Sequence, residues 1–333
     1  MSKETRGSII QSGGLVDVFL STLFYIIIPT FLIAWLCKNR NRSVKKWLFE
    51  IIFIGSYFLN LFFIGFWVVY PFGHIARYLL LVSFLIAAVK SYFTIRRSPQ
   101  LNGKNPEPPK KQLAIHLVSY SIFVLLAGVF SWELFGAVKG SQNPGGSIEL
   151  DFPLKNGVYY IIQGGNDSTL NHHHGVSAQK FALDIVKMNH LGLRTKNLLP
   201  SKEKDYNICG EDIYSPCSGL ILKAMNTVKS MPVIEMNQTN PAGNFVAIKQ
   251  EGTDNVIILA HLLDGSICVQ EGDIICRGQL LGQVGSSGNS SEPHLHIHCA
   301  SPNEAGDFLF QGEGIPLTFN NKFLIRNDSF IAK

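Results

Sequence analysis

The chain begins with long apolar runs and continues with short ones. Four nearly uncharged runs are each long enough to cross a hydrocarbon core about 30 Å thick, which takes roughly 20 helical residues. A helix inside a soluble protein rarely stays apolar over such a length. The pattern predicts an N-terminal α-helical membrane domain over residues 1–138 with four spans, at Leu15–Cys37, Leu48–Tyr70, Ile75–Ile95 and Leu113–Trp132.

Positive charges indicate which loops between these spans face the cytoplasm. The loop Lys38–Lys46 holds five Lys and Arg residues and the segment Lys90–Lys111 holds six, whereas the connection between the second and third spans has only Arg77, at the start of the third span. Because positively charged short loops stay in the cytoplasm, the first and third loops are predicted to be cytoplasmic. Both termini, and everything after the fourth span, are then predicted to lie outside.

In the second part of the chain the apolar runs shorten to the length of strands. A linker is predicted at 139–150, where the chain reads KGSQNPGGS over 139–147. The runs after it are rich in β-branched and aromatic residues and are bounded by Gly, Pro, Asn or Asp. They predict an all-β domain over 151–333, an antiparallel sandwich or barrel. Its strands are expected at 157–165, 181–186, 219–224, 244–250, 255–262, 279–285 and 294–300.

The two parts also differ in charge. Residues 1–140 contain 15 Lys and Arg against 5 Asp and Glu, a net charge of +10, whereas residues 141–333 contain 14 against 19, a net charge of −5. The positive charge of the chain therefore belongs to the membrane loops. The β part has no basic patch, which argues against nucleic acid as a partner.

The six cysteines leave two interpretations open. None forms a CxxC or CxxH motif, which argues against a thiolate zinc site. In an oxidising compartment, Cys209 could pair with Cys217 and Cys268 with Cys276, which leaves Cys299 over. Alternatively, the cysteines of the β part are small buried apolar residues.

Histidines occupy alternate positions of the last predicted strand, in PHLHIHCA. Side chains alternate between the faces of a strand, so His294, His296 and His298 point the same way. A hydrolytic zinc site takes about three imidazole or carboxylate ligands and leaves one position for water. The stretch NHHHGVSAQKFALDIV over 171–186 adds a histidine cluster and Asp184, which stands in an apolar strand. A carboxylate buried there needs a cation or a metal.

Two further stretches add to this pattern. The run NVIILAHLLDG places His261 at the end of an apolar strand, where spacing alone does not decide between a ligand and an acid or base. The run VQEGDIICRGQLLGQVGSSG over 269–288 places glycines at tight turns between short strands. It resembles the half-barrel turns of lipoyl and biotinyl domains and of their larger, duplicated relatives.

Several stretches together resemble the lysostaphin/LytM-type zinc metallopeptidases. ILAHL and VQEGDIICRGQLLGQVGSSGNSSEPHLHIH are similar to the family's A-H-L, G-D-x-V-x-x-G-Q and P-H-L-H motifs, and IYSPCSGLILKA and GNFVAIKQ to two of its upstream strands. They occur in the family's order within residues 155–302. The resemblance implies the duplicated hybrid motif fold, with antiparallel β-sheet, and one Zn²⁺ per chain.

The same resemblance implies roles for individual residues. The second histidine of P-H-L-H and an upstream Asp bind zinc in this family, which implies that His296 and Asp184 are ligands. The first histidine of P-H-L-H and the histidine of A-H-L are catalytic, which implies that role for His294 and His261. The sequence departs from the family at Lys180, where many members have the first ligand, the histidine of H-x-x-x-D. A protonated lysine is a poor ligand, so Lys180 does not take that role.

A subgroup of the family has another form of this motif, N-x-H, a gap, and then Q-[RK]-[YF]-A-x-D. The stretch NHHHGVSAQKFALD matches that form, which implies His173 as the first ligand, with His174 and His172 as alternatives. Many members have Glu at the position of His298. We expect His298 to support His296 through a hydrogen bond, or else to be an ordinary strand residue.

The resemblance thus implies a membrane-anchored zinc metalloendopeptidase that uses metal-activated water and two catalytic histidines. Members of the family cut peptides of cell-wall peptidoglycan, which implies those peptides as substrate. It also implies the outer face of a bacterial cytoplasmic membrane as the location, with the lipid bilayer as the second partner. The side predicted from the loop charges agrees with that location.

Two other functions fit parts of the sequence. The same β domain could bind cell wall or activate a partner hydrolase without catalysis, although such proteins typically lack zinc ligands. A phosphocarrier-like domain of a membrane transport protein would need two facing histidines and a cytoplasmic location, which the loop charges oppose.

Overall fold

The structure, a computed structural model, describes residues 19–39, 43–97, 110–230, 232–233, 235–304 and 306–333. Residues 15–18 of the first predicted span lie outside these ranges. Contacts divide the described chain into two compact units. One unit contains most of the apolar helices. The other contains the β domain from Gly136 onward together with Phe66–Gly73.

Four long apolar helices form the first part of the described chain, which confirms the predicted helical membrane domain. The second predicted span needs correction, because its helix ends at Ile64 and not at Tyr70. Gly65 leaves the helical conformation, and a short 3-10 turn follows. The bounds are η1 (Leu23–Ile27), α2 (Ile28–Lys38), α3 (Val44–Ile64), η2 (Trp67–Val69), α4 (Gly73–Arg96) and α5 (Lys110–Gly140).

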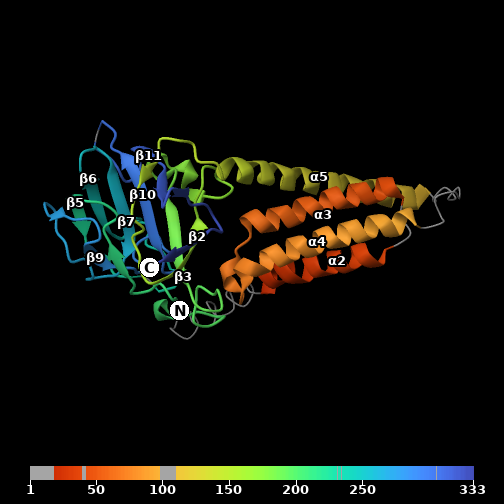
Figure 1. Cartoon of the computed structure of the whole chain (residues 1–333), viewed down its shortest axis with the longest axis horizontal. Helices are drawn as coiled ribbons and strands as arrows, with labels where there is room; N and C mark the ends of the chain where they lie inside the picture. The colour runs from red at the N-terminus through yellow and green to blue at the C-terminus, as the bar shows by residue number, and fades with distance from the viewer. Residues whose placement is uncertain (1–18, 40–42, 98–109, 231, 234, 305) are drawn as a thin grey trace. The chain divides into compact units, whose positions relative to one another are not determined.

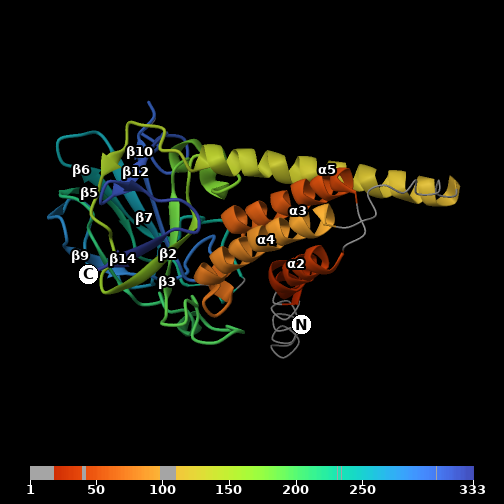
Figure 2. The same cartoon turned by 45° about the vertical axis from the view of Figure 1, so that its right-hand side comes forward.

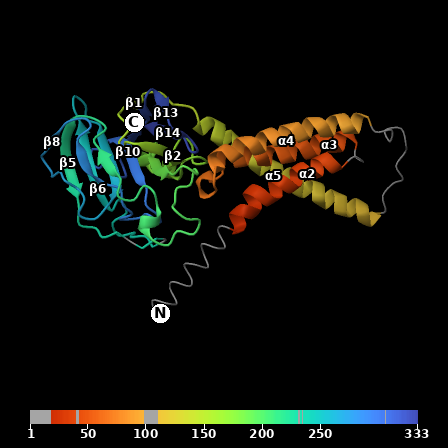
Figure 3. The same cartoon turned by 60° about the horizontal axis from the view of Figure 1, so that its bottom comes forward.

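Helix α3 is the centre of the helical unit. Its Phe58 packs with Leu36 of α2 and stacks on Phe84 of α4, with ring centroids 4.8 Å apart. Phe53 of α3 contacts Phe123 of α5 at 4.8 Å between ring centroids. Figures 2 and 3 show α3 and α4 side by side along their length. Many large apolar side chains of these helices remain exposed, as a surface that faces lipid requires.

One antiparallel sheet of nine strands forms the framework of the β domain (Figure 1). Eight strands follow in the order β14-β2-β3-β10-β7-β6-β5-β8, and β11 pairs with β10. Two small sheets accompany it, β4-β9 and β1-β12-β13. The bounds are β1 (Ile148–Glu149), β2 (Gly157–Gln163), β3 (Leu183–Met188), β4 (Asp212–Tyr214), β5 (Gly219–Met225), β6 (Asn244–Gln250), β7 (Val256–Leu262), β8 (Ile274–Ile275), β9 (Leu280–Gln283), β10 (Leu295–Ser301), β11 (Glu313–Ile315), β12 (Leu317–Phe319), β13 (Lys322–Phe323) and β14 (Ser329–Ala332).

The sheet confirms the predicted antiparallel β domain. A strand lies at each of the seven predicted positions, and β6 coincides with the predicted 244–250 residue for residue. The short strands β1, β4, β8 and β11 to β14 were not predicted. Residues 139–150 include the end of α5 and strand β1, which pairs in parallel with β12.

Strand β10 lies between β3 and β7, and its two faces differ. Leu295, Ile297 and Cys299 enter the main apolar core and are at most 1% exposed. His296 and His298 point to the other face and are also buried. Because the apolar face is packed, the histidine face stands on a rigid strand.

All six cysteines are free, so the disulfides that the sequence left open do not form. Cys217 and Cys299 are buried in the main core, where they behave as small apolar side chains. Cys268 and Cys276 are exposed. For the two buried thiols, burial raises the pKa, to about 11 for Cys217 and further for Cys299, which makes both unreactive at neutral pH.

Candidate active site

The centre of the site comes from two neighbouring strands. In the register of β3 and β10, Asp184 lies directly opposite His296. Nδ1 of His296 is 2.9 Å from Oδ1 of Asp184, and both side chains are nearly completely buried. The strand pairing therefore brings together two predicted ligands that are 112 positions apart in the chain.

The three consecutive histidines lie next to them, in a short 3-10 turn, η4 (His172–Gly175). Nε2 of His173 lies 3.0 and 3.1 Å from the two carboxylate oxygens of Asp184. Asn171 fixes the turn, because its side-chain oxygen accepts from the backbone N–H of His173 and its amide donates to carbonyl groups of Gly165 and Ala182. Asn171 is completely buried, so the turn is held firmly against β3.

His261 reaches the site because β7 contains a bulge. The residues paired with β6 pass from Leu262 to Ala260, which leaves His261 as the extra residue. Its φ of 64° is left-handed, a strained conformation for a residue with a side chain. Ala260 lies opposite His296, so regular alternation would point His261 to the other face. The bulge turns its ring towards the site, with its centroid 5.7 Å from that of His296.

A glycine-rich loop after β9 orients the ring of His261. The carbonyl of Ser287 accepts from Nδ1 of His261 at 2.9 Å. Gly288 has a φ of 83°, and a Cβ there would lie 2.4 Å from the backbone N of Gly243. The two glycines therefore let the loop approach β6 closely enough to place that carbonyl.

His294, just before β10, is oriented in the same way. Its Nδ1 donates to the carbonyl of Glu292 at 2.9 Å, and Oγ of Ser290 lies 3.2 Å from the same nitrogen. Nε2 of His294 lies 3.6 Å from Oδ1 of Asp184, beyond a hydrogen bond. The rings of His261 and His294 are neighbours, with centroids 4.8 Å apart.

The electrostatics of the cluster keep the carboxylate of Asp184 ionised. Burial opposes ionisation of Asp184, but the charges of His173 and His294 and hydrogen bonds with His173 and His296 hold its pKa well below the usual range. Burial lowers the pKa of His173, but Asp184 and hydrogen bonds raise it overall. Burial and the neighbouring imidazoles lower the pKa of His261 well below its usual value.

The contacts of His296 direct one of its ring nitrogens to Asp184 and the other to His298. Nε2 of His298 faces the carbonyl of Phe308 at 3.4 Å and so carries a proton, while Nδ1 of His298 accepts from Nε2 of His296 at 2.9 Å. Burial lowers the pKa of both histidines to about 3, so both rings are neutral. Nδ1 is the nitrogen of His296 that faces the carboxylate oxygen of Asp184, at 2.9 Å. A cation at this point would be held by an imidazole nitrogen and a carboxylate oxygen.

His173 is oriented by a second chain of hydrogen bonds. The side-chain amide of Gln179 donates to the carbonyl of Leu309 at 3.0 Å, which leaves its oxygen to accept from His173. Nε2 is then the nitrogen of His173 that faces Asp184. Two imidazole nitrogens and one carboxylate are a typical donor set for Zn²⁺, so the residues fit the predicted metal.

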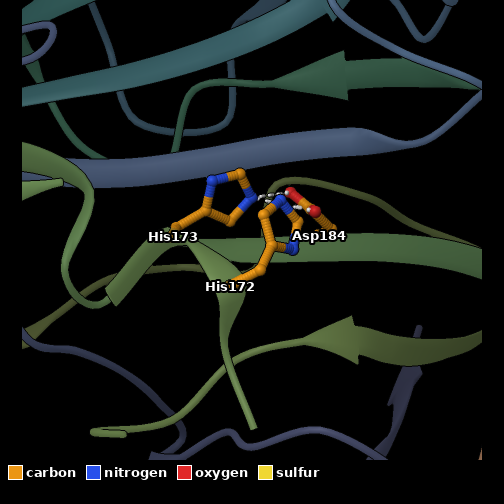
Figure 4. Close-up of side chains that lie close together, drawn as sticks. All are labelled: His172, His173 and Asp184. Carbon is orange, nitrogen blue, oxygen red and sulfur yellow. Dashed lines mark hydrogen bonds and ion pairs between the residues drawn. The ribbon is translucent and has the colours of Figure 1, made fainter. Parts of the chain in front are cut away.

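The structure distinguishes the three histidines of the turn. Nitrogen atoms of His172 and His173 and an oxygen of Asp184 lie within 4.8 Å of one another, which makes these three a possible metal-binding group. Figure 4 shows the ring of His173 joined to the carboxylate by hydrogen bonds, with the ring of His172 beside it. His172 is exposed. We favour His296 over His172 as the third ligand, because His296 is buried and contacts Asp184 directly.

His174 does not join this group. Its ring packs edge-on against Phe181, with centroids 6.5 Å apart. Burial lowers the pKa of His174. Of the alternatives that the sequence left open, His172 therefore stays within reach of the carboxylate and His174 does not.

The predicted site residues His173, Asp184, His261, His294 and His296 thus meet in one cluster. His298 bonds to His296, as one of its two expected roles requires. Sequence reasoning missed Gln179 and Asn171 as supporting residues, although both stand in the motif that pointed to His173. It also missed the carbonyl groups that orient His261 and His294, because a carbonyl is present in every residue and leaves no signal.

Residues 205–307 match Peptidase family M23. The matched stretch makes up about a third of the chain and lies within the β domain. The match includes His261, His294 and His296 but begins after His173 and Asp184. A search of curated proteins finds no match.

Solved structures include similar M23 peptidases. A zinc-containing peptidase from Vibrio cholerae is 25% identical, with a TM-score of 0.21, and the match covers 28% of this chain and 24% of that one. The catalytic domain of lysostaphin from Staphylococcus simulans is 21% identical, with a TM-score of 0.21 and coverage of 30% and 70%. A prophage-encoded M23 protein from Enterococcus faecalis is 24% identical, with a TM-score of 0.20 and coverage of 33% and 75%. The chain spans about a quarter of the Vibrio protein.

Proposed function

We propose that this protein is a membrane-anchored zinc metalloendopeptidase that hydrolyses peptide bonds of cell-wall peptidoglycan. The observation that carries this proposal is the convergence of His173 and His296 on the buried carboxylate of Asp184. The match to Peptidase family M23 supports peptidase activity. Dependence on zinc rests on the resemblance of the motifs to those of zinc metallopeptidases. The choice of peptidoglycan rests on the resemblance of the motifs to those of wall-cutting peptidases.

In this proposal His173, Asp184 and His296 hold one Zn²⁺. When bound, the ion supplies Lewis acidity and lowers the pKa of a water molecule. The short distances from His173 and His296 to the carboxylate of Asp184 support this assignment. The low pKa of the carboxylate keeps it charged and ready to bind a cation.

His261 and His294 handle protons in this proposal. In each ring Nδ1 donates to a backbone carbonyl, so the neutral ring carries its lone pair on Nε2. That nitrogen can accept a proton from the attacking water and return it to the leaving amine. A protonated ring beside the scissile carbonyl would also stabilise the developing oxyanion.

We place the β domain on the outer face of a bacterial cytoplasmic membrane, where peptidoglycan lies. The Lys and Arg residues of the first and third loops support this side. The segment Phe66–Gly73, which follows the second span, folds with the β domain in one compact unit. That contact requires the segment and the β domain to lie on the same side of the membrane. The orientation predicted from the loop charges also puts them on the same side.

Incubation of the full-length protein in detergent with purified peptidoglycan tests the proposal. Mass spectrometry of the soluble products should show peptides with new amino termini, and a chelator should abolish them until zinc is added back. The His190→Ala variant is a matched control, because His190 is an exposed histidine of the same domain outside the cluster. Intact peptidoglycan after incubation with protein of verified zinc content would instead favour a wall-binding module. A cytoplasm-only reporter that is active at the C-terminus would contradict the location.

A further inference from the structure

The segment Phe66–Gly73 joins two membrane helices, yet it is built into the β domain. Trp67 is 2% exposed and Val68 is completely buried. Val68 packs against side chains of strands β2 and β3, namely Tyr160, Ile162, Val186 and Met188. The segment therefore contributes to an apolar cluster of the domain that carries Asp184.

Backbone hydrogen bonds attach this segment to the loop that follows β3. The carbonyl of Val68 accepts from the N–H of Arg194 at 3.1 Å. The N–H of Phe72 donates to the carbonyl of Leu191. Both ends of the segment are thus tied to the loop from which the side chain of Arg194 extends.

The side chain of Arg194 contacts both this segment and Glu292, a residue near the site. Its guanidinium lies over the ring of Phe66, 5.0 Å from the centroid, and over Tyr206 at 5.7 Å. Nε and Nη2 of Arg194 donate to the two carboxylate oxygens of Glu292 at 2.9 and 2.8 Å. The ion pair is therefore bidentate. The side chains of Arg194 and Glu292 are only 13% and 16% exposed, so water screens the pair little.

Glu292 in turn controls the orientation of His294. Its backbone carbonyl accepts from Nδ1 of His294 at 2.9 Å and from Oγ of Ser290 at 2.8 Å. A displacement of Glu292 would remove the acceptor that keeps the proton on Nδ1. Nε2 of His294 would then lose the lone pair that our proposed function assigns to proton transfer.

We propose that Arg194 and Glu292 are positioning residues for His294, and that the segment Phe66–Gly73 holds them in place. This inference rests on the proposed function for the role of His294, although the orientation of the ring can be measured without activity. The inference also explains why the second and third spans are present. One span would tether the β domain, whereas α3 and α4 are required to supply the segment Phe66–Gly73.

Three substitutions test the chain of contacts in the full-length protein. Phe66→Ala removes the ring under the guanidinium, Arg194→Leu removes the ion pair, and Arg194→Lys keeps the charge but not the two-pronged geometry. We expect unchanged zinc content and KM, with kcat about 10- to 100-fold lower for Arg194→Leu and smaller losses for the other two. Lys249→Ala is the matched control, because it breaks an exposed ion pair with Asp254 of the same domain and should not change kcat.

Histidine nitrogen NMR of the zinc-loaded, ¹⁵N-histidine-labelled chain provides the readout that needs no activity. The wild type should show His294 with a protonated Nδ1, whereas Phe66→Ala and Arg194→Leu should show a mixture of both tautomers. If Arg194→Leu does not fold, Phe66→Ala still tests the inference. Wild-type kcat together with an unchanged tautomer in the folded variants would overturn it. A wild type without peptidase activity whose His294 still responds to Phe66→Ala would overturn the proposed function and support the inference.

Discussion

The histidine cluster consists of two pairs that resemble each other in burial but differ in what they contact. His173 and His296 reach the carboxylate of Asp184 at 3.0 and 2.9 Å, whereas Nε2 of His294 remains 3.6 Å away. The rings of the first pair are oriented by side chains, and those of the second pair by backbone carbonyls. In each pair these partners fix which ring nitrogen faces the centre of the site. Under the proposed function the same residue type would serve as ligand in the first pair and as proton carrier in the second.

The largest effect should come from removing the centre of the first pair. We expect Asp184→Asn to lose zinc and hydrolysis together, because it removes the charge that binds the ion and changes little else in size. His173→Ala should do the same and His174→Ala should not, because only His173 contacts the carboxylate. Zinc analysis of each purified variant and peptide release from peptidoglycan measure both quantities. Hydrolysis by an Asp184→Asn protein of verified metal content would remove Asp184 from the ligand set.

Substitutions in the second pair should lower turnover without removing zinc. We expect His294→Ala and His261→Ala to keep zinc and to lower kcat by about 10²- to 10⁴-fold, the usual contribution of an acid or base. Zinc analysis alongside steady-state kinetics makes the measurement. Loss of zinc from either variant would mean that the two pairs are not distinct in function.

A smaller effect should follow from the residues that orient the first pair. Gln179→Ala and His298→Ala should weaken zinc binding by about 10- to 100-fold without abolishing it, because the ligand rings lose their fixed proton positions. Competition with a zinc chelator measures the affinity. His298→Glu should restore part of the affinity, because a carboxylate also accepts from Nε2 of His296. Affinities equal to the wild type in both alanine variants would show that neither residue supports the site.

The smallest effect concerns stability against pH in the chelator-treated protein. The pKa values of His261, His296 and His298 are lowered in the fold, so below about pH 6.5 the unfolded chain binds more protons than the folded one. The free energy of unfolding should therefore decrease as the pH is lowered, by roughly 1.4 kcal/mol per pH unit for each such proton. The raised pKa of His173 acts in the opposite direction and offsets part of this loss. Urea midpoints at pH 7 and pH 5.5 measure the net change, and a higher midpoint at pH 5.5 would contradict the assignment of neutral buried rings.

Much of the fold was predictable because its signals are local. Strand β6 follows directly from its aromatic and β-branched residues, Phe245, Val246 and Ile248. The face shared by His296 and His298 follows from alternation alone. The segment Phe66–Gly73 shows where such signals fail, since an apolar stretch such as Trp67–Val69 suits a lipid-facing helix and a protein core equally well. Composition assigned part of it to the membrane, whereas contacts with β2 and β3 place it in the β domain.

The site was predictable in its residue types but not in its geometry. The bulge that turns His261 depends on the register between β6 and β7, which nothing near His261 in the sequence indicates. The pair of Arg194 and Glu292 joins residues 98 positions apart, and each alone looks like an ordinary surface charge. These features arise from pairing between distant strands and loops, which a single sequence does not reveal.

X-ray absorption at the zinc edge of the full-length, metal-loaded protein tests the central claim most directly. The proposal predicts one zinc per chain with two imidazole ligands and oxygen ligands, and one imidazole in the His296→Ala variant if any zinc remains. Three imidazoles in the wild type would add His172 to the ligand set. A chain without stoichiometric zinc, or one whose zinc spectrum is unchanged in His296→Ala, would contradict the assignment of His173, Asp184 and His296 as the metal site.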